Sequence, residues 1–501
     1  MAYGYRLNWG GLLMAASLFL APARGFTATT QAKSTAPKTA SKLYQTTNVL
    51  TAHFTFSPDQ WRAMEPTRTE GDDGRRGGGL GGPGGPNLTG RAGSRNGLAA
   101  VRGIEFNYVH ASLEVAGGRF TNVAVRYKGN GTYFRSQSSL KRSLKVDLNE
   151  FVKGQKLAGM TKLNFHSEIS DPSWMIEPLS YGLYRDAGVP APRTAYVKVY
   201  LTVPGRYERT YMGLYAMVED VDQHFAEDRF GTKKGAIFKP VGPYLFRYLG
   251  TNWDAYQQQY DPKTKLTPAQ SQRMMDFCQL ITSAKDEEFA KRIGSFLDLQ
   301  EFSRFLAMTV CLSSLDSILG MSQNFYMYLD PKSDRFQFIP WDLDNSFGKF
   351  RMTGTQTERE QLSIMHPWHG EDRFIERVFQ VPAFQKLYRA RLQEFSKGVF
   401  KPDRIHKQVD ELAPFLRPGI REESASRLNL FEKGLAGESV SPDFGEGDQR
   451  GPRGVRNQQN MNTPIKPIKQ FVTARSQSLA DQLAGKSEGS TITRRFGMGG
   501  R

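Results

Sequence analysis

The stretch RFQFIPWDLDNSFG, residues 335–348, places two acidic side chains directly after a predicted strand. The apolar and aromatic run Phe336–Ile339 indicates a buried strand, and Asp342 and Asp344 follow it. Carboxylates at the end of a strand suit a hard divalent cation, because Mg²⁺ prefers oxygen ligands and keeps water and phosphate in its remaining positions. We expect both to be metal ligands and favour Asp342 as the main one, although the spacing does not separate them. The alternative is that both residues only form turns and helix caps.

A second pair of polar residues lies upstream, where Asp316 and Asn324 precede another strand-like run, Asn324–Leu329. The resulting order is Asp, Asn, strand, turn, strand, Asp. This order is similar to that of protein kinases, in which the first Asp accepts a hydroxyl proton, the Asn holds metal and the second Asp bridges metal to phosphates. Asp316 is therefore a candidate catalytic base and Asn324 a candidate metal ligand.

Residues 101–220 predict strands that one helix interrupts. Asp171, Pro172 and Ser173 supply an N-cap and a first-turn proline, and Gly188 ends the helix. Pro178 falls inside this pattern and should bend the helix or delay its start. The strands predicted from alternating, β-branched and aromatic runs are 49–56, 104–109, 112–115, 121–127, 143–148, 194–203 and 211–218.

A glycine-bearing turn, RYKGNG at 126–131, follows one of these strands and offers Lys128, Gly129 and Gly131 as nucleotide contacts. Such a turn is also what an ordinary hairpin contains. On the next strand, the ammonium of Lys145 would meet the α- and β-phosphates, unless this lysine only faces solvent.

Further acids complete the predicted site. Glu177, on the helix, is the kind of acid that pairs with the strand lysine in kinases, and Glu168 is a competing partner. Glu219 and Asp222 follow an apolar strand, where they would contact ribose or adenine or cap the next helix.

The second half of the chain, from about Pro268, reads as mainly helical. A strand-rich first half with one embedded helix, followed by helices, predicts an α+β fold with two lobes. We expect a β-rich N-lobe at 45–220 and a helical C-lobe at 221–485. The predicted helices are 268–283, 286–296, 298–315, 371–397, 403–414, 421–433 and 464–485.

Several of these segments together resemble the spore coat protein H (CotH) kinase-like family. The resemblance rests on RYKGNGTYFRS, YRDAGVPAPR and the block PWDLD-x-x-FG, and it extends from about Arg126 to Gly348 with a similar helical tail. It implies an atypical, minimal protein kinase fold that binds ATP with Mg²⁺ or Mn²⁺. It also implies that Lys145 holds phosphates, that Glu177 orients it, that Asp316 is the base and that Asp342 binds the metal.

The ends of the chain and two internal segments differ in composition from the rest. Residues 1–25 carry Arg6, an apolar run and small residues, the pattern of a signal peptide, and 26–44 form a flexible leader. Segments 71–97 and 434–464 and the tail 486–501 are rich in Gly or Arg, typical of flexible insertions. Export is therefore expected, with no transmembrane span in the mature chain.

The net charge of +17 favours an acidic partner, but part of the basic excess lies in these Gly- and Arg-rich segments. Specific nucleic-acid binding is therefore not expected. The two cysteines, Cys278 and Cys311, lack neighbours at metal-ligand spacing, so structural zinc is not expected. Buried free thiols are expected, and a single disulfide is the alternative for an exported chain.

The leading hypothesis is an exported kinase that phosphorylates Ser or Thr of exported or cell-surface proteins. The rival from another class is a non-catalytic surface or coat scaffold that keeps the same fold to bind a partner. A third reading is nucleic-acid or glycan binding through the Arg- and Gly-rich tails.

Overall fold

The computed structural model describes residues 36–68, 88–90, 92–242, 244–370, 372–442 and 464–492. All of them fall within one unit of the chain, Thr35–Arg501. The predicted signal peptide, most of the leader, and the larger parts of both insertions and of the tail lie outside the described residues.

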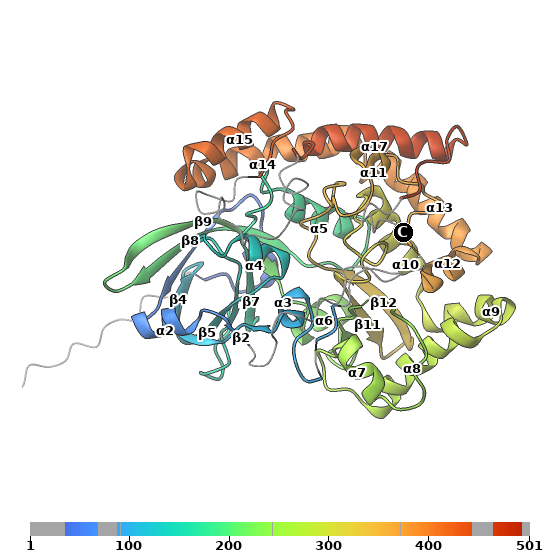
Figure 1. Cartoon of the computed structure of the whole chain (residues 1–501), viewed down its shortest axis with the longest axis horizontal. Coiled ribbons are helices and arrows are strands. Elements are labelled where there is room, and N and C mark those ends of the chain that lie inside the picture. Colours follow the sequence, from blue (N-terminus) through green and yellow to red (C-terminus); the bar gives the residue numbers. More distant parts are fainter. Residues whose placement is uncertain are drawn as a thin grey trace, which may run out of the picture. The chain divides into compact units, whose positions relative to one another are not determined.

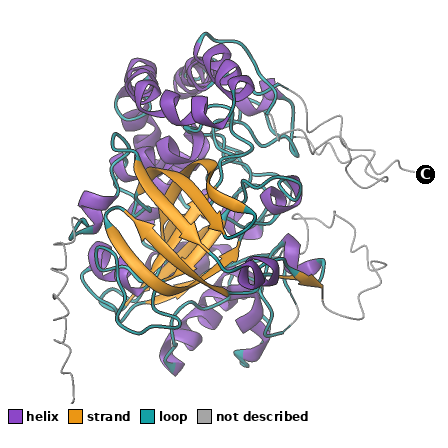
Figure 2. Ribbon diagram, turned by 90° about the vertical axis from the view of Figure 1, so that its left-hand side faces the viewer, coloured by secondary structure: helices purple, strands orange, loops and turns teal. Residues whose placement is uncertain are grey.

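Seven strands of the first half close into a barrel in the order β1-β4-β5-β6-β7-β9-β8 (Figures 1 and 2). Neighbouring strands are antiparallel except β1 and β8, which pair in parallel. The strands are β1 (Leu50–Thr55), β4 (Val109–Val115), β5 (Gly118–Tyr127), β6 (Leu144–Asp147), β7 (Lys162–His166), β8 (Thr194–Val203) and β9 (Tyr207–Glu219).

Alternation of apolar and polar residues explains the barrel, because it gives each strand one face for the interior. In β4 (Val109–Val115) every second side chain is buried. Phe54, Val123, Phe165 and Met217, from four different strands, belong to one apolar cluster. The predicted strand 104–109 is interrupted at 106–108: β3 (Ile104–Glu105) is a two-residue strand that pairs with β2 (Thr67–Arg68) outside the barrel, and Val109 already begins β4.

The helix embedded among these strands is α5 (Ile176–Asp186). The carboxylate of Asp171 accepts hydrogen bonds from the main-chain N–H groups of Ser173 (2.8 Å) and Ile176 (2.8 Å). Pro178 lies in the first turn of α5, where its missing N–H removes no intrahelical bond. The proline thus delays the start of the helix, as expected, and leaves its body intact.

The second half combines helices with a three-stranded antiparallel sheet in the order β10-β11-β12. Phe277, Phe302, Phe338 and Phe374 form the centre of its apolar core. The elements of this half are α6 (Gln223–Phe230), β10 (Ala236–Phe238), α7 (Asp254–Tyr260), α8 (Pro268–Ser283), α9 (Asp286–Phe296), α10 (Leu299–Cys311), β11 (Phe325–Asp330), β12 (Arg335–Pro340), α11 (Gln356–Glu360), α12 (Arg373–Phe379), α13 (Pro382–Lys397), α14 (Pro402–Glu423), α15 (Ala425–Leu435) and α17 (Ile468–Leu483).

Prolines explain two differences from the expected helices. The predicted helix 371–397 is two helices, because Pro382 opens α13 at its first position and separates it from α12. Conversely, α14 continues through Pro414 and Pro418 to Glu423. Its C-terminal end packs on barrel strand β9, where the Glu423 carboxylate accepts hydrogen bonds from Leu214 N and Lys141 Nζ, each at 2.6 Å. This contact offsets the helix bonds that the prolines remove.

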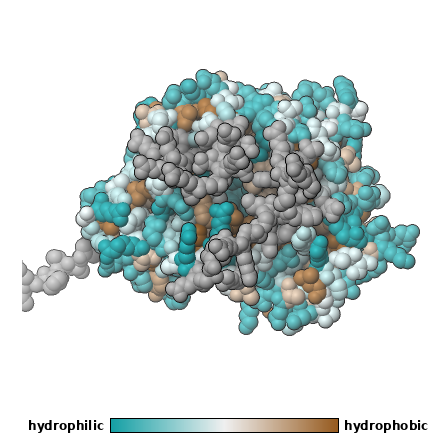
Figure 3. All heavy atoms as spheres, in the orientation of Figure 1, coloured by the Kyte–Doolittle hydropathy of each residue, from teal (hydrophilic) through white to brown (hydrophobic). Residues whose placement is uncertain are grey.

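The chain therefore has a mixed α+β fold, with a β-rich first part and a helical C-terminal part. Cys278 and Cys311 are buried and free. None of the helices within the described ranges has both the length and the apolar character that a membrane span requires. On the face drawn in Figure 3, hydrophobic residues form only small separate patches among hydrophilic ones.

Candidate active site

A cleft open to solvent lies where the loops after β5, β7 and β12 come together, with an empty volume of about 670 Å³. Four of its lining residues follow strands of the second half: Lys239 after β10, and Trp341, Asp342 and Asp344 after β12. The cleft is lined by Arg95, Asn96, Lys128, Gly129, Asn130, Thr132, Ser143, His166, Ser167, Glu168, Ile169, Ser170, Glu177, Lys239, Trp341, Asp342 and Asp344.

A chain of hydrogen bonds joins Lys128, His166 and Glu177 on one wall of the cleft. The Lys128 ammonium bonds to Nε2 of His166, and Nδ1 of the same ring lies 2.7 Å from Oε2 of Glu177. With Lys128 charged, Nε2 accepts and Nδ1–H donates to the carboxylate. Burial lowers the pKa of Lys128 to about 8. Burial opposes the charge on Glu177, but His166 more than offsets it and the pKa of Glu177 is lowered. The histidine therefore links the lysine to the helix acid.

The predicted pairing of Lys145 with Glu177 is absent. Lys145 Nζ instead lies 3.0 and 3.2 Å from the two carboxylate oxygens of Asp220, which also accepts a hydrogen bond from Asn164 Nδ2 at 2.9 Å. Burial works against the charged form of Asp220, yet the Lys145 ammonium and Asn164 hold the pKa of Asp220 well below its usual range. Lys145 does not line the cleft, because the strand turns its side chain toward this acid.

Glu168, the competing acid, lies beside Glu177 rather than beside Lys145. Only 6% of Glu168 is exposed, and its carboxyl group can bond to that of Glu177 when one of the two is protonated. Burial and the neighbouring Glu177 raise the pKa of Glu168 well above its ordinary value. One ligand atom each from His166, Glu168 and Glu177 lies within 4.8 Å of the others. This group suits a shared proton or, when deprotonated, a cation.

The acids after β12 face the same cleft. Burial raises the pKa of Asp344 to about 7; the nearby Lys349 lowers it, while Asp342, Glu177 and Asp316 raise it further. Asn345 Nδ2 bridges two acids, at 2.9 Å from Asp316 and 3.1 Å from Asp344. Such crowding of carboxylates is costly unless a proton or a cation compensates it. Asp342 and Asp344 therefore fit a hard divalent cation.

Asp316 does not line the cleft but is joined to it through Asn345. Its other carboxylate oxygen accepts a hydrogen bond from Gln323 at 2.6 Å. Burial raises the pKa of Asp316 to about 6. Asn324 is outside the lining of the cleft: its Nδ2 donates to the main-chain oxygen of Asp316 at 2.9 Å, and its main-chain oxygen accepts from Trp341 N at 3.0 Å. Asn324 thus fastens the Asp316 loop to the residue before Asp342. Its role as a metal ligand stays a prediction.

The remaining predicted residues divide between the cleft and the surrounding structure. Lys128 and Gly129 line the cleft, and Gly129 has a φ of 100° that favours glycine. Gly131 begins the short helix α4 (Gly131–Arg135), so the expected direct turn between strands is wrong. Glu219 is outside the cleft: it is 1% exposed, and its carboxylate binds Arg193 at 3.0 Å and Arg229 at 2.9 Å.

Asp222 takes the second of its two predicted roles. Its carboxylate accepts the main-chain N–H groups of His224 (2.8 Å) and Phe225 (3.1 Å) and so caps α6. Sequence reasoning missed several cleft residues, among them His166 and Lys239. A signal existed for His166, which is a polar residue at the end of the apolar strand β7.

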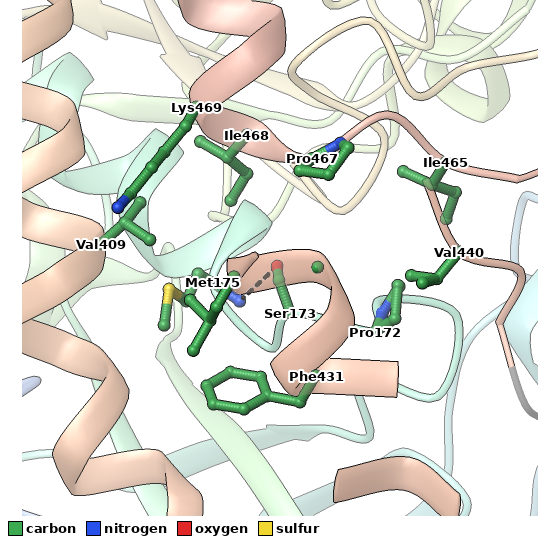
Figure 4. A pocket seen from close by; sticks show the side chains of 12 residues that line it. Pro172, Ser173, Met175, Val409, Phe431, Val440, Ile465, Pro467, Ile468 and Lys469 are labelled. Atoms are coloured by element: carbon green, nitrogen blue, oxygen red, sulfur yellow. Dashed lines mark hydrogen bonds between the residues drawn. The ribbon is translucent and has the colours of Figure 1, made fainter. Parts of the chain in front are cut away.

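A second hollow is apolar and lacks this chemistry (Figure 4). Met175, Phe431 and Ile468 point into it, and Lys469 is its only titratable lining residue within the described part of the chain. The dashed line in Figure 4 joins Ser173 Oγ to the Met175 N–H at 3.2 Å. We therefore assign the function to the polar cleft.

Comparison with known proteins identifies a family and several relatives that are similar to this chain. Residues 125–479 match the family described as CotH kinase protein. The inner spore coat protein H of Bacillus subtilis (strain 168) is 22% identical over 275 residues, which are 54% of this chain and 72% of that protein. The inner spore coat protein H-like protein of the same organism is 25% identical over 264 residues, or 51% and 68% of the two chains. The spore coat protein homolog 1 of Rhizopus delemar is 20% identical over 281 residues, or 54% and 44%.

One solved structure is similar at a low level. It is the Shewanella oneidensis MR-1 toxin-antitoxin system HipA, HipB and operator DNA complex, with 11% identity and a TM-score of 0.24 over 69% of this chain and 65% of that chain. A TM-score this low does not establish a common fold.

Proposed function

Because the chain belongs to the CotH kinase protein family, we propose that it transfers the γ-phosphoryl group of ATP to Ser or Thr side chains of exported proteins. The observation that carries the proposal is that one cleft contains both a lysine ammonium that can bind phosphate and two carboxylates that can bind a divalent cation. The Lys128, His166 and Glu177 chain offers a held ammonium for phosphate, and Asp342 and Asp344 offer carboxylates for a divalent cation.

We further propose that the fold is kinase-like, with the barrel part, 45–220, as the smaller lobe and residues 221–485 as the larger one. The cleft supports this division, since Lys128 and Glu177 come from the first range and Lys239 and Asp342 from the second. Kinases bind nucleotide between two such parts. The spore coat names of the relatives support a place outside the cytoplasm.

The proposed roles of the residues follow from their contacts. Lys128, held by His166 and indirectly by Glu177, binds the phosphates, and Asp342 and Asp344 would hold Mg²⁺ or Mn²⁺. Such a cation supplies positive charge where the transferred phosphoryl group is most negative. Asp316, with a pKa of about 6, is ionised at neutral pH and accepts the proton of the acceptor hydroxyl at its carboxylate. The rest of catalysis is positioning.

The test is phosphoryl transfer from γ-labelled ATP with Mg²⁺ or Mn²⁺, measured as label on the chain itself and on a Ser- and Thr-rich acceptor such as casein. We expect label with the wild type and a loss of at least a hundredfold in Asp342→Asn. Asp403→Asn is the matched control, because its side chain is 85% exposed on α14. A wild type that neither transfers label nor binds ATP would favour the non-catalytic coat scaffold.

A further inference from the structure

Lys239 is a fixed cation of the cleft whose role the sequence did not reveal. It follows β10, and its main-chain N–H is held by the carbonyl oxygens of Tyr260 (2.9 Å) and Asp261 (3.2 Å). Its ammonium lies 5.5 Å from the ring centroid of Trp341 and 5.3 Å from that of Tyr326. The backbone and two aromatic rings therefore set where this charge sits.

The Lys239 ammonium has neither a hydrogen bond nor an ion pair to any residue in the described ranges. Two neighbouring lysines differ in this respect: Lys145 pairs with Asp220, and Lys263 pairs with Asp261. Burial, followed by repulsion from Lys263 and Lys128, lowers the pKa of Lys239 to about 7, against a smaller opposing effect of Asp342. A cation that is partly withdrawn from water without an anionic partner is costly, and a bound anion would offset that cost.

Lys128 adds a second ammonium close to the same aromatic ring. Its Nζ lies 5.2 Å from the centroid of Trp341, and its one hydrogen-bond partner within the described ranges is His166, which carries no negative charge to neutralise it. Trp341 is only 5% exposed, so it holds both lysines against a rigid surface. The cleft thus presents two cations without direct carboxylate partners next to Asp342, which suits a cation.

We propose that Lys239 and Lys128 form one anion subsite around Trp341 that binds the phosphate groups of the nucleotide. This inference rests on the proposed function for the identity of the ligand. Phosphate chains fit the subsite because they need ammonium donors on some oxygens and a divalent cation on others, and the cleft offers both within one space. The competing interpretation is that Lys239 only packs on Trp341 and Tyr326.

The experiment measures binding of inorganic tripolyphosphate, without metal, to the full chain by calorimetry. Lys239→Met keeps the length and packing of the side chain and removes its charge, whereas Lys239→Arg keeps the charge. Lys332→Gln, at an exposed position in the turn between β11 and β12, is the control for the loss of one positive charge. Thermal unfolding of each variant reports whether the fold is intact.

We expect Lys239→Met to bind tripolyphosphate at least tenfold more weakly, Lys239→Arg to stay within about threefold of the wild type, and Lys332→Gln to stay within twofold. Equal affinity of Lys239→Met and the control would overturn the proposal, as would a wild type that does not bind tripolyphosphate. Because this assay needs no catalysis, the two proposals fail separately. If tripolyphosphate binding depends on Lys239 but the chain transfers no phosphoryl group, the proposed anion subsite stands and the proposed kinase activity is rejected.

Discussion

Replacing His166 by Ala should destabilise the protein through the buried acid that it contacts. Glu177 is 0% exposed. One of its carboxylate oxygens is held by His166 Nδ1 at 2.7 Å. Removing the histidine takes this bond from the buried Glu177 carboxylate, which then has only Glu168 beside it, and it takes the acceptor from Lys128.

The expected cost follows from these contacts. Removing the hydrogen-bond partner of a buried group costs about 1–3 kcal/mol, and more where the group is charged, as the Glu177 carboxylate is. Protonation of Glu177 in the variant would relieve part of this cost, so we expect about 2–4 kcal/mol at pH 7 and less at pH 5. Equilibrium unfolding in urea at both pH values measures the effect. His406→Ala is the control, since the hydrogen bonds of the His406 ring within the described residues go to the Lys469 carbonyl and to Thr473 and not to a buried acid.

A double-mutant cycle isolates the interaction. Adding Glu177→Gln to His166→Ala should recover at least about 1 kcal/mol, because the amide needs no countercharge. The reasoning is refuted if His166→Ala costs no more than His406→Ala, or if the two substitutions at 166 and 177 are additive.

Three further predictions use other parts of the site. Asp344→Asn should weaken Mn²⁺ binding in the presence of ATP by at least tenfold, measured by electron paramagnetic resonance, and unchanged binding would remove Asp344 from the metal site. The pKa of Asp316 is raised from 3.8 to about 6 in the folded chain, so its contribution to stability is present below about pH 4 and is lost as pH rises through 6. Asp316→Asn should therefore flatten the pH dependence of the free energy of unfolding in urea over this range. An unaltered pH profile would contradict the raised pKa of Asp316. Glu219→Gln should lower the free energy of unfolding, because Arg193 and Arg229 lose their buried partner, but should leave the affinity for ATP within twofold; a large loss of affinity would return Glu219 to the nucleotide site.

Local patterns in the sequence predicted much of the fold. Helices α8 and α9 begin and end where their prolines, acids and apolar spacing indicated, and β8 matches its predicted bounds. Closure of the barrel was beyond this reasoning, because the parallel pairing of β1 with β8 joins segments about 150 residues apart. The strand β7, KLNFH, was missed because its side chains are buried without alternation, except for the first.

The sequence analysis proposed the two acids that follow β12, but it did not predict which lysines and acids pair with each other. Asp342 and Asp344 were found because they directly follow a clear strand. The partner of Lys145 could not be predicted from the sequence. Lys145 lies on β6 and Asp220 directly follows β9, and only the closed barrel brings these two segments together. Lys239 escaped notice because a lysine after a three-residue strand has no local signature of a ligand contact.

Binding of MgATP to the full chain tests the central claim most directly, with Lys128→Met compared with Lys145→Met by calorimetry. The account predicts that Lys128→Met binds at least tenfold more weakly than the wild type. It also predicts that Lys145→Met keeps an affinity for MgATP within about threefold of that of the wild type, although its free energy of unfolding is lower. The reason is that Lys145 forms an ion pair with Asp220 and does not line the cleft. The reverse order, with loss of affinity in Lys145→Met and none in Lys128→Met, would contradict the account.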